Sequence, residues 1–282
     1  MTTVINNENL PEDAAELFRE KVFDYYRNHR RSFPWRETTG RYAVMVSEIM
    51  LQQTQAERVR EKFILWMERF PDVFSLAAAS QREVLALWSG LGYNSRGQRL
   101  HFCAKAVVER FGGIVPGDPL VLKNLPGIGE YTSRSIPAFA DNLDVAAVDT
   151  NIRRIIIHEF TLPDLTKTPD IQRMADRLLP KGRSREWHNA LMDYGAQHLT
   201  ARKTGIRPLT KQSKFQDSRR WYRGRLLKEL VEIEQMSLEE VEEKFSSCPW
   251  GIGEIITGLV REGFVEETEN PYGPGKVLRI KS

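Results

Sequence analysis

Two carboxyl groups in this sequence stand where they could do acid–base chemistry, and the first is Glu48. It lies in the segment YAVMVSEIMLQQTQ, residues 42–55, whose first half reads as an apolar helix. A Glu buried in such a helix has a raised pKa and is able to act as a general acid. A capping or solvent-facing Glu is the alternative interpretation. Glu48 is therefore a candidate catalytic acid.

The second carboxyl group is Asp149, in the segment AAVDTNIRRII, residues 146–156. It falls between the apolar Val148 and a helical run that contains Ile152 and Ile155, where an Asp commonly caps a helix. The functional alternative is a carboxylate beside a glycosidic bond, which stabilises or traps the positive charge that develops at the anomeric carbon. Spacing alone does not separate these two interpretations.

A third segment, LKNLPGIGEYTSRSI at residues 122–136, reads as two helices joined by a tight turn. The first helix ends near Asn124 and the second opens near Tyr131. Gly127 and Gly129 permit a positive φ and a close approach of the backbone. Amides at the start of the second helix suit a phosphate oxygen of DNA, bound directly or through a monovalent cation. An ordinary turn is the alternative, but the spacing matches the helix-hairpin-helix DNA-binding element.

The elements that must position these residues read as helices. No sustained alternating strand pattern occurs between residues 13 and 200, so the predicted fold class is mainly α. Breakers such as Phe33-Pro34 and Gly112-Gly113 separate the helices. The segments that repeat apolar residues at intervals of three and four are AAELFREKVFDYYRNH (14–29), AERVREKFILWMERF (56–70), QREVLALWSGL (81–91), RGQRLHFCAKAVVERF (96–111) and PDIQRMADRLLP (169–180).

The last sixty residues have a different pattern. GRLLKELVEI, SLEEVEEKF and IGEIITGLVREGF read as three helices, and Ser237 with Glu240 forms a capping box for the second. FVEETENPYGPGKVLRI then reads as a β-hairpin with a Pro/Gly turn. This order resembles a small winged-helix-like domain, and a helical tail with a loose end is the alternative. The predicted domains are a helical core at 1–200, a basic linker at 201–222 and a winged-helix-like domain at 223–282.

Composition bounds the class of protein. No apolar run approaches the ~20 residues that a membrane span needs, and the N-terminus lacks the pattern of a secretory signal. An intracellular protein is expected, cytoplasmic and nucleoid-associated if bacterial or archaeal. The chain has 2 cysteines, Cys103 and Cys248. They offer neither a disulfide framework nor a four-cysteine metal site, and no metal ligands are predicted.

Positive charge is concentrated after the helical core, although the net charge is only +3. The aromatic residues Phe215, Trp221 and Tyr222 are interleaved with it. Such a stretch could neutralise phosphates and stack on bases, and a solvated linker is the alternative. Its basic residues are Arg202, Lys203, Arg207, Lys211, Lys214, Arg219, Arg220, Arg223 and Arg225.

Six blocks together make a specific resemblance. They are FPWR, VSEIMLQQTQ, WSGLGYNSR, LPGIGEYT, VDTNIRR and NALMDYGA, and they cover roughly residues 20 to 200. In order and spacing they are similar to the MutY family of adenine DNA glycosylases, in the helix-hairpin-helix (HhH-GPD) superfamily. The resemblance implies a two-lobed helical glycosylase core that binds double-stranded DNA as a monomer. The hairpin and a downstream Asp alone would indicate only the wider superfamily, which includes endonuclease III, and MLQQT points to the MutY branch.

The resemblance also implies roles for the catalytic residues. Glu48 would protonate N7 of adenine, and Asp149 would stabilise the oxocarbenium ion. Asn151 would hydrogen-bond near the two carboxylates, and Tyr131 would orient them. Bifunctional relatives carry at the Tyr131 position a lysine that attacks C1′. Tyrosine cannot form that Schiff base, so base release without efficient strand cutting is expected.

Further residues are implied around the flipped base and the gap it leaves. Trp35 and Arg36 would flank the base pocket, and Asp193 matches an acidic residue that lines it. The polar cluster QQTQ at residues 52–55 suits contacts with base edges. Thr54 of this cluster is a candidate DNA-binding residue, and the residues expected to fill or probe the duplex around the opposite base are Leu51, Gln53 and Tyr93.

Two departures from the family pattern stand out. The family usually carries an iron–sulfur cluster on a C-x6-C-x2-C-x5-C run after the segment that matches MDYGA, and here QHLTARKTGIRPLTKQSKF has no cysteine. A member without the cluster is expected, in which packing and the basic stretch replace the cluster loop. Long family members also end in a Nudix-like domain that helps recognise 8-oxoguanine. No such domain fits the last sixty residues, which leaves the opposite-base preference open.

Three alternative functions remain beside adenine excision opposite 8-oxoguanine or G. A thymine or uracil glycosylase acting on mismatches with G is also compatible with Tyr131. An endonuclease III-like lyase is disfavoured by the same residue. A DNA-binding protein without catalysis would have lost Glu48 or Asp149, and both are present.

Overall fold

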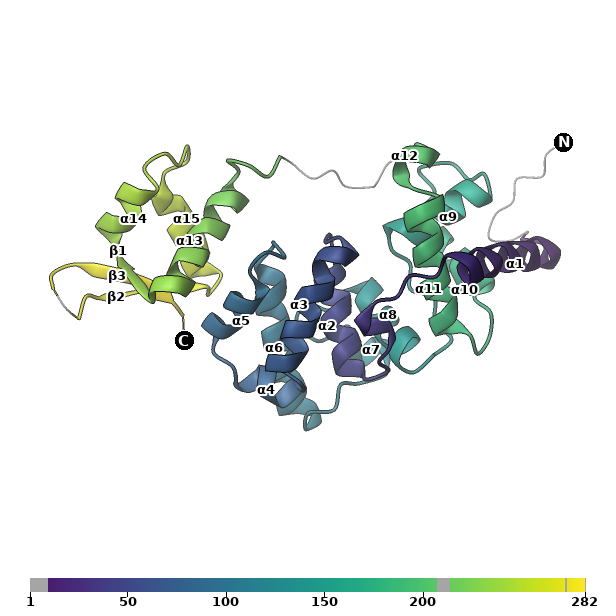
Figure 1. Cartoon of the computed structure of the whole chain (residues 1–282), viewed down its shortest axis with the longest axis horizontal. Helices are drawn as coiled ribbons and strands as arrows, with labels where there is room; N and C mark the ends of the chain where they lie inside the picture. Colours follow the sequence, from purple (N-terminus) through teal and green to yellow (C-terminus); the bar gives the residue numbers. More distant parts are fainter. Residues whose placement is uncertain (1–9, 207–213, 272, 282) are drawn as a thin grey trace. The chain divides into compact units, whose positions relative to one another are not determined.

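The computed structural model describes residues 10–206, 214–271 and 273–281. Helices dominate in this part of the chain, as the sequence predicts (Figure 1). The chain divides into two compact units, Met1–Glu48 with Val115–Lys211, and Ile49–Ile114 with Gln212–Ser282. Each is described by itself below as unit 1 and unit 2. The predicted boundaries at residues 200 and 222 stay a prediction. No helix of the described residues is long and apolar enough to cross a bilayer.

The regular elements among the described residues of unit 1 are all helices, and they are built on one aromatic-rich core. Phe18 packs edge-to-face on Trp187 and on Phe160, with ring centroids 5.7 and 5.3 Å apart. Tyr194 and Ile155 are buried in the same core. The elements of unit 1 are α1 (Glu12–His29), η1 (Pro34–Arg36), the first part of α2 (Arg41–Leu51), α7 (Pro119–Leu122), α8 (Glu130–Ala140), α9 (Thr150–Glu159), α10 (Thr168–Leu178), α11 (Ser184–Asp193), the π-helical η2 (Tyr194–His198) and α12 (Ala201–Thr204).

Unit 2 combines a helical bundle with the C-terminal residues. Trp66 and Trp88 are fully buried in the bundle, with ring centroids 5.7 Å apart. The C-terminal residues pack on α5 through Leu85, and Gln81 donates to the carbonyls of Gly263 and Phe264. The elements of unit 2 are α3 (Ala56–Arg69), α4 (Val73–Ala78), α5 (Gln81–Trp88), α6 (Ser95–Phe111), α13 (Arg219–Ile233), β1 (Gln235–Ser237), α14 (Leu238–Lys244), α15 (Ile252–Arg261), β2 (Val265–Glu269) and β3 (Lys276–Ile280).

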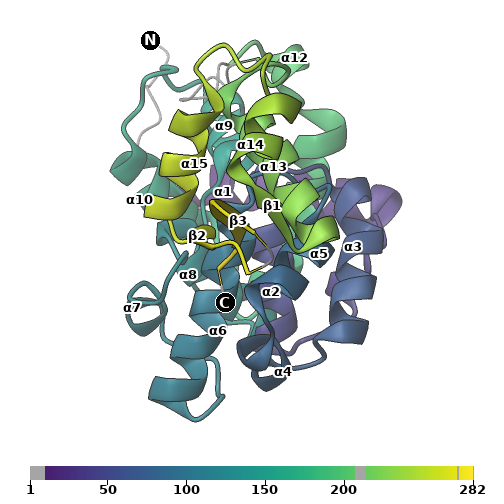
Figure 2. The same cartoon turned by 90° about the vertical axis from the view of Figure 1, so that its left-hand side faces the viewer.

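The predicted C-terminal hairpin is confirmed as β2 and β3, which pair antiparallel with Thr268 opposite Val277. Figure 2 shows these strands beside α13 to α15. The predicted capping box is also found, because Ser237 accepts from the Glu240 amide and Glu240 accepts from the Ser237 amide. The short strand β1 was not predicted, and it completes a sheet in the order β1-β3-β2. Three residues are too few for an alternating pattern to be recognised in the sequence.

The basic stretch is divided among different surroundings. Arg207 and Lys211 lie outside the described residues. Arg202 and Lys203 are exposed on α12. The larger group, on α13, is engaged within the protein, because Arg219 pairs with Glu254 at 2.8 Å and Arg223 pairs with Glu262 at 2.6 Å. The interpretation of the whole stretch as one phosphate-binding surface stays a prediction.

Candidate active site

Glu48 lies near the end of α2 and is the last residue of the first of the two segments that make up unit 1. Only 7% of it is exposed, so the predicted burial is confirmed. Burial raises the pKa of Glu48 to about 7, hydrogen bonds to Ser135 and Tyr131 oppose this shift, and the nearby charge of Asp149 adds to it. Among the described residues, Oε2 of Glu48 has no hydrogen-bond partner. This carboxyl group can hold a proton near neutral pH and has one oxygen free to present it.

Asp149 combines the two interpretations that its spacing left open. It is the N-cap of α9, and Oδ1 accepts from the Ile152 amide at 2.8 Å. Oδ2 accepts from the side-chain amide of Asn151 at 3.0 Å. Burial raises the pKa of Asp149, while the hydrogen bonds from Ile152 and Asn151 counteract the rise. The cap thus fixes the carboxylate in one orientation, and its charge is felt by Glu48.

A second layer of hydrogen bonds holds Asn151, and sequence reasoning missed its main member, Arg154. Nη2 of Arg154 donates to Oδ1 of Asn151 at 2.7 Å and to the Gly195 carbonyl at 3.0 Å. Its Nε donates to the Leu199 carbonyl at 2.8 Å. A Cβ at Gly195 would lie only 3.0 Å from Cδ1 of Ile155, so a side chain there would disturb this packing. The i, i+3 spacing of Asn151 and Arg154 on α9 was the available signal.

Tyr131 and Ser135 are one helical turn apart on α8, and both lie against Glu48. Burial raises the pKa of Tyr131 well above its usual value, and the charges of Glu48 and Asp149 raise it further. The phenol is therefore neutral near pH 7. It can position a carboxyl group by hydrogen bonding, but it supplies no amine. Ser135 is a second site residue that the sequence analysis did not single out.

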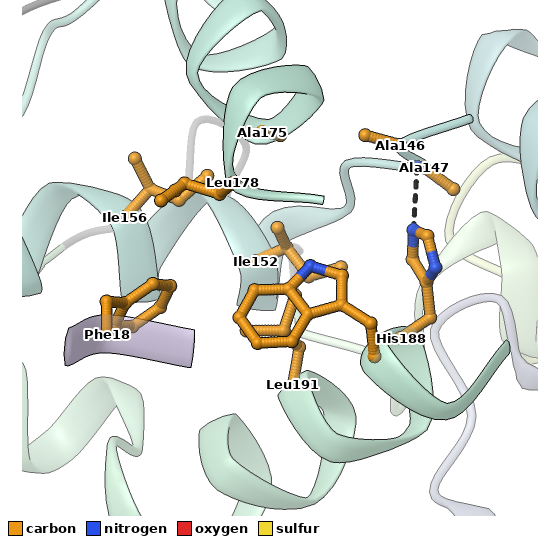
Figure 3. Close-up of a pocket in the computed structure, with 10 residues that line it drawn as sticks. Phe18, Ala146, Ala147, Ile152, Ile156, Ala175, Leu178, His188 and Leu191 are labelled. Carbon is orange, nitrogen blue, oxygen red and sulfur yellow. Dashed lines mark hydrogen bonds between the residues drawn. The ribbon is translucent and has the colours of Figure 1, made fainter. Parts of the chain in front are cut away.

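The backbone that leads into Asp149 is held by side chains. The Ala147 amide donates to Nε2 of His188 at 2.9 Å, as the dashed line in Figure 3 shows. Because Nδ1 lies 2.7 Å from the Ser184 carbonyl, the ring carries its proton on Nδ1 and accepts at Nε2. Burial lowers the pKa of His188 to about 4, which keeps the ring neutral. The adjoining cavity is about 10 Å³, no larger than one water.

The predicted hairpin lies between α7 and α8. Gly127 has a φ of 78°, in the left-handed region that favours glycine, as the tight turn requires. The prediction of a positive φ at Gly129 is wrong, because Gly129 is the N-cap of α8 and has an extended conformation with φ −95°. A Cβ at Gly129 would meet nothing within 4 Å. The backbone there does not require glycine, and the missing side chain leaves open space in front of the first amides of α8. The first amides of α8 lack earlier helical carbonyls and can bind an anion.

The candidate pocket residues Trp35, Arg36 and Asp193 are also in unit 1. Asp193 is fully buried and accepts from Arg36 at 2.8 and 2.9 Å and from the Arg31 amide at 3.0 Å. Burial favours a raised pKa for Asp193, but the hydrogen bonds from Arg36 and Arg31 outweigh it and leave the pKa lowered. Trp35 stacks on Phe33 with centroids 4.7 Å apart. Asp193 is therefore an ionised carboxylate that the two arginines hold, and its predicted contact with a base stays a prediction.

The residues assigned to the opposite base are in unit 2. Gln53 and Tyr93 have φ of 57° and 48°, uncommon for residues with a side chain, and each is in a loop. Arg96, which the sequence analysis overlooked, joins these loops. Its Nη1 donates to the Met50 carbonyl at 2.9 Å and its Nη2 to the Gly92 carbonyl at 3.0 Å. Leu51 and Thr54 are partly buried beside them, and Thr54 accepts from Nη2 of Arg96 at 3.0 Å.

The helical fold described above is shared with DNA base-excision proteins. The family model for the HhH-GPD superfamily base excision DNA repair proteins matches residues 46–181. A solved thermostable thymine-DNA glycosylase is similar with a TM-score of 0.64 and 25% identity, over 68% of this chain and 90% of that one. A trapped endonuclease III–DNA covalent intermediate, with a TM-score of 0.61 and 15% identity, shows the same fold.

Curated relatives narrow the assignment. The adenine DNA glycosylase of Mycolicibacterium smegmatis is 32% identical over 270 residues, 88% of this chain and 92% of that protein. That of Mus musculus is 34% identical over 258 residues, 84% of this chain, and the chain spans 50% of its length. The chain belongs to the adenine DNA glycosylase family of the HhH-GPD superfamily.

Proposed function

We propose that this chain is a monofunctional DNA glycosylase that excises adenine mispaired with 8-oxoguanine or G. The observation that carries the proposal is the pair of carboxyl groups in unit 1. Glu48 retains a proton near pH 7 and presents an unpartnered Oε2, whereas Asp149 is fixed by its cap and by Asn151. One group is suited to donate a proton and the other to face positive charge.

In the proposed reaction Glu48 donates its proton to N7 of the flipped adenine, and the bond between N9 and C1′ breaks with its electron pair leaving on the base. Positive charge then develops on the sugar at C1′ and O4′, where Asp149 stabilises it. A water molecule adds to C1′ and loses a proton, which leaves an abasic site. Asn151, Arg154, Tyr131 and Ser135 orient the carboxyl groups. Tyr131 supplies no amine, so the strand remains intact.

The other candidate residues bind DNA in this proposal. The amides that follow Gly127 and Gly129 hold a phosphate, directly or through a monovalent cation. Trp35, Arg36 and Asp193 surround the extruded base. The partner is double-stranded DNA inside the cell, contacted by a monomer at a mismatched pair. The residues proposed to contact the opposite base and the duplex around it are Leu51, Gln53, Thr54 and Tyr93.

We also propose that the chain works without an iron–sulfur cluster, because its residues do not fit one. Four thiolates hold such clusters, and the chain has 2 cysteines, both buried and both in unit 2. The segment after Asp193 instead contributes Leu199 and Ile206 to the apolar core of unit 1. Hydrophobic packing, together with the bond from Arg154 to the Leu199 carbonyl, takes over the anchoring of this segment.

Thymine excision from G:T mismatches is the second candidate, favoured by the structural similarity to a thymine-DNA glycosylase. The decisive experiment incubates the protein with duplexes carrying each mismatch and then cleaves abasic sites with hot alkali. Alkali-dependent cleavage at A opposite 8-oxoguanine or G is expected. Cleavage only at T or U opposite G would replace the proposed function by the second candidate. Cleavage before alkali would contradict the monofunctional assignment.

A further inference from the structure

The backbone around Tyr93 is unusually well fixed for a loop. Gly90, Gly92 and Tyr93 all have positive φ, with values of 93°, 74° and 48°. The Gly92 carbonyl accepts from both Arg96 at 3.0 Å and the indole of Trp88 at 3.1 Å. Arg96 is 9% exposed, so water has little access to these bonds. These bonds fix the main chain around Tyr93. They do not fix its side chain, which is only partly buried.

The C-terminal residues of the same unit hold that side chain. Arg220, in the first turn of α13, donates to the Tyr93 hydroxyl, and its guanidinium lies 5.0 Å from the ring centroid. The Arg96 guanidinium lies 5.8 Å from the same ring. Tyr93 is therefore contacted by two cations, one from α6 and one from α13. Such contacts restrict both the plane of a phenol ring and the direction of its hydroxyl.

Helix α13 is itself anchored, so the position of Arg220 is defined. Its neighbours Arg219 and Arg223 pair with Glu254 and with Glu262. On the side of α5, Arg82 donates to the Val231 carbonyl near the end of α13, at 2.6 and 2.9 Å. These interactions fasten the helix at both ends, within unit 2. Arg220 thus reaches Tyr93 from a rigid support.

We propose that Arg220 is a specificity-determining residue, which sets the Tyr93 side chain for reading the base opposite the excised one. This inference rests on the proposed function, in which Tyr93 contacts that base. With Arg220 as donor to the phenol oxygen, the Tyr93 hydroxyl proton is free to point at an acceptor on the opposite base. A residue of the C-terminal segment would then contribute to discrimination, without being a catalytic residue.

The test compares Arg220→Ala with wild type in single-turnover base release from A:8-oxoguanine and A:G duplexes, at saturating enzyme. The ratio of the two rates is expected to fall by about fivefold. Arg220→Lys keeps a cation over the ring and is expected to retain most of the ratio. Arg225→Ala is the matched control, because it removes the same charge from the same helix. Arg225 lies over Trp221. The ratio of the two rates for this variant should equal that of wild type. Melting temperatures check that each variant is folded.

A double-mutant cycle with Tyr93→Phe shows whether the contact carries the effect. The double variant should be no worse than Tyr93→Phe alone, because that variant already lacks the hydroxyl through which Arg220 acts. Additive losses, or an Arg220→Ala variant that binds both duplexes more weakly with an unchanged ratio, would overturn the proposal and make Arg220 a phosphate contact. If wild type releases thymine and no adenine, the proposed function has failed. The Arg220 proposal is then decided by the ratio of thymine release opposite G and opposite A.

Discussion

At the scale of single residues, the site separates two carboxyl groups by their surroundings. Glu48 is buried with one oxygen unpartnered, and its pKa is raised to about 7. The pKa of Asp149 is also raised by burial, but hydrogen bonds from the Ile152 amide and from Asn151 stabilise its ionised form. The neutral group suits proton donation, and the charged group suits stabilisation of a cation. Environment assigns the roles here, because the two side chains have the same chemistry in water.

We predict that Glu48→Gln and Asp149→Asn each reduce base release by at least about 100-fold and leave duplex binding largely intact. The wild-type rate should fall as pH rises through about 7, because Glu48 loses its proton there. It should also fall in acid, as Asp149 becomes protonated above its ordinary pKa. Single-turnover rates across pH, with binding measured in parallel, check both. Loss of binding in step with activity would mean that the residues maintain the fold instead.

Glu48 should also make stability depend on pH. The pKa of Glu48 is about 7 in the folded protein and 4.5 in the unfolded chain. The stabilisation that Glu48 contributes is therefore fully present below pH 4.5, and it is lost as pH rises through about 7. Between about pH 5 and pH 8 the free energy of unfolding of wild type should therefore fall by about 2 to 3 kcal/mol more than that of Glu48→Gln. Urea unfolding at both pH values measures this. Equal pH dependence of the two proteins would refute a buried, proton-retaining Glu48.

At the scale of elements, the short α12 and the longer α13 use their arginines differently. On α13, Arg219 and Arg223 are paired with Glu254 and Glu262, so replacing these two would remove ion pairs within unit 2 as well as charges that could face DNA. Helix α12 comes shortly after the π-helical η2 and is capped by Thr200. It exposes Arg202 and Lys203. We therefore expect the phosphate contacts of the basic stretch to lie on α12.

Replacing Arg202 and Lys203 by Ala should weaken binding about equally for matched and mismatched duplexes, because phosphate contacts carry no sequence information. The slope of log K against log salt should become shallower by about two. The chemical rate at saturating enzyme should stay unchanged. Fluorescence anisotropy at several salt concentrations provides the measurement, and Arg173→Ala, which removes a surface arginine paired with Asp170 on α10, is the control. A loss confined to one duplex would contradict this assignment.

At the scale of the whole molecule, the two units are stabilised by different kinds of interaction. Unit 1 relies on an aromatic core into which the segment after Asp193 sends Leu199 and Ile206. Unit 2 joins the C-terminal residues to α5 with the buried side chain of Gln81 and with Leu85. In neither unit do the described residues bring three or more His, Cys, Asp or Glu side chains into a metal-binding group.

The purified protein is predicted to be colourless and to contain far less than one iron per chain, because 2 cysteines cannot ligate a four-iron cluster. Iron analysis and visible absorbance of protein purified without oxygen provide the measurement. A relative that has the cysteine run, purified in parallel, is the positive control. A brown preparation with about four irons per chain would show that other ligands hold a cluster.

The sequence by itself determined the helices, the hairpin turn, the C-terminal strands and both carboxyl groups, because periodicity, capping and glycine spacing are local properties. It also determined that the chain lacks the cysteine run. Only the tertiary structure decided that Asp149 is cap and oriented carboxylate at once, and that Glu48 is buried with a free oxygen. Contacts between distant segments, such as His188 with Ala147 and Arg220 with Tyr93, leave no periodic signal in the sequence. They form only when packing brings those segments together.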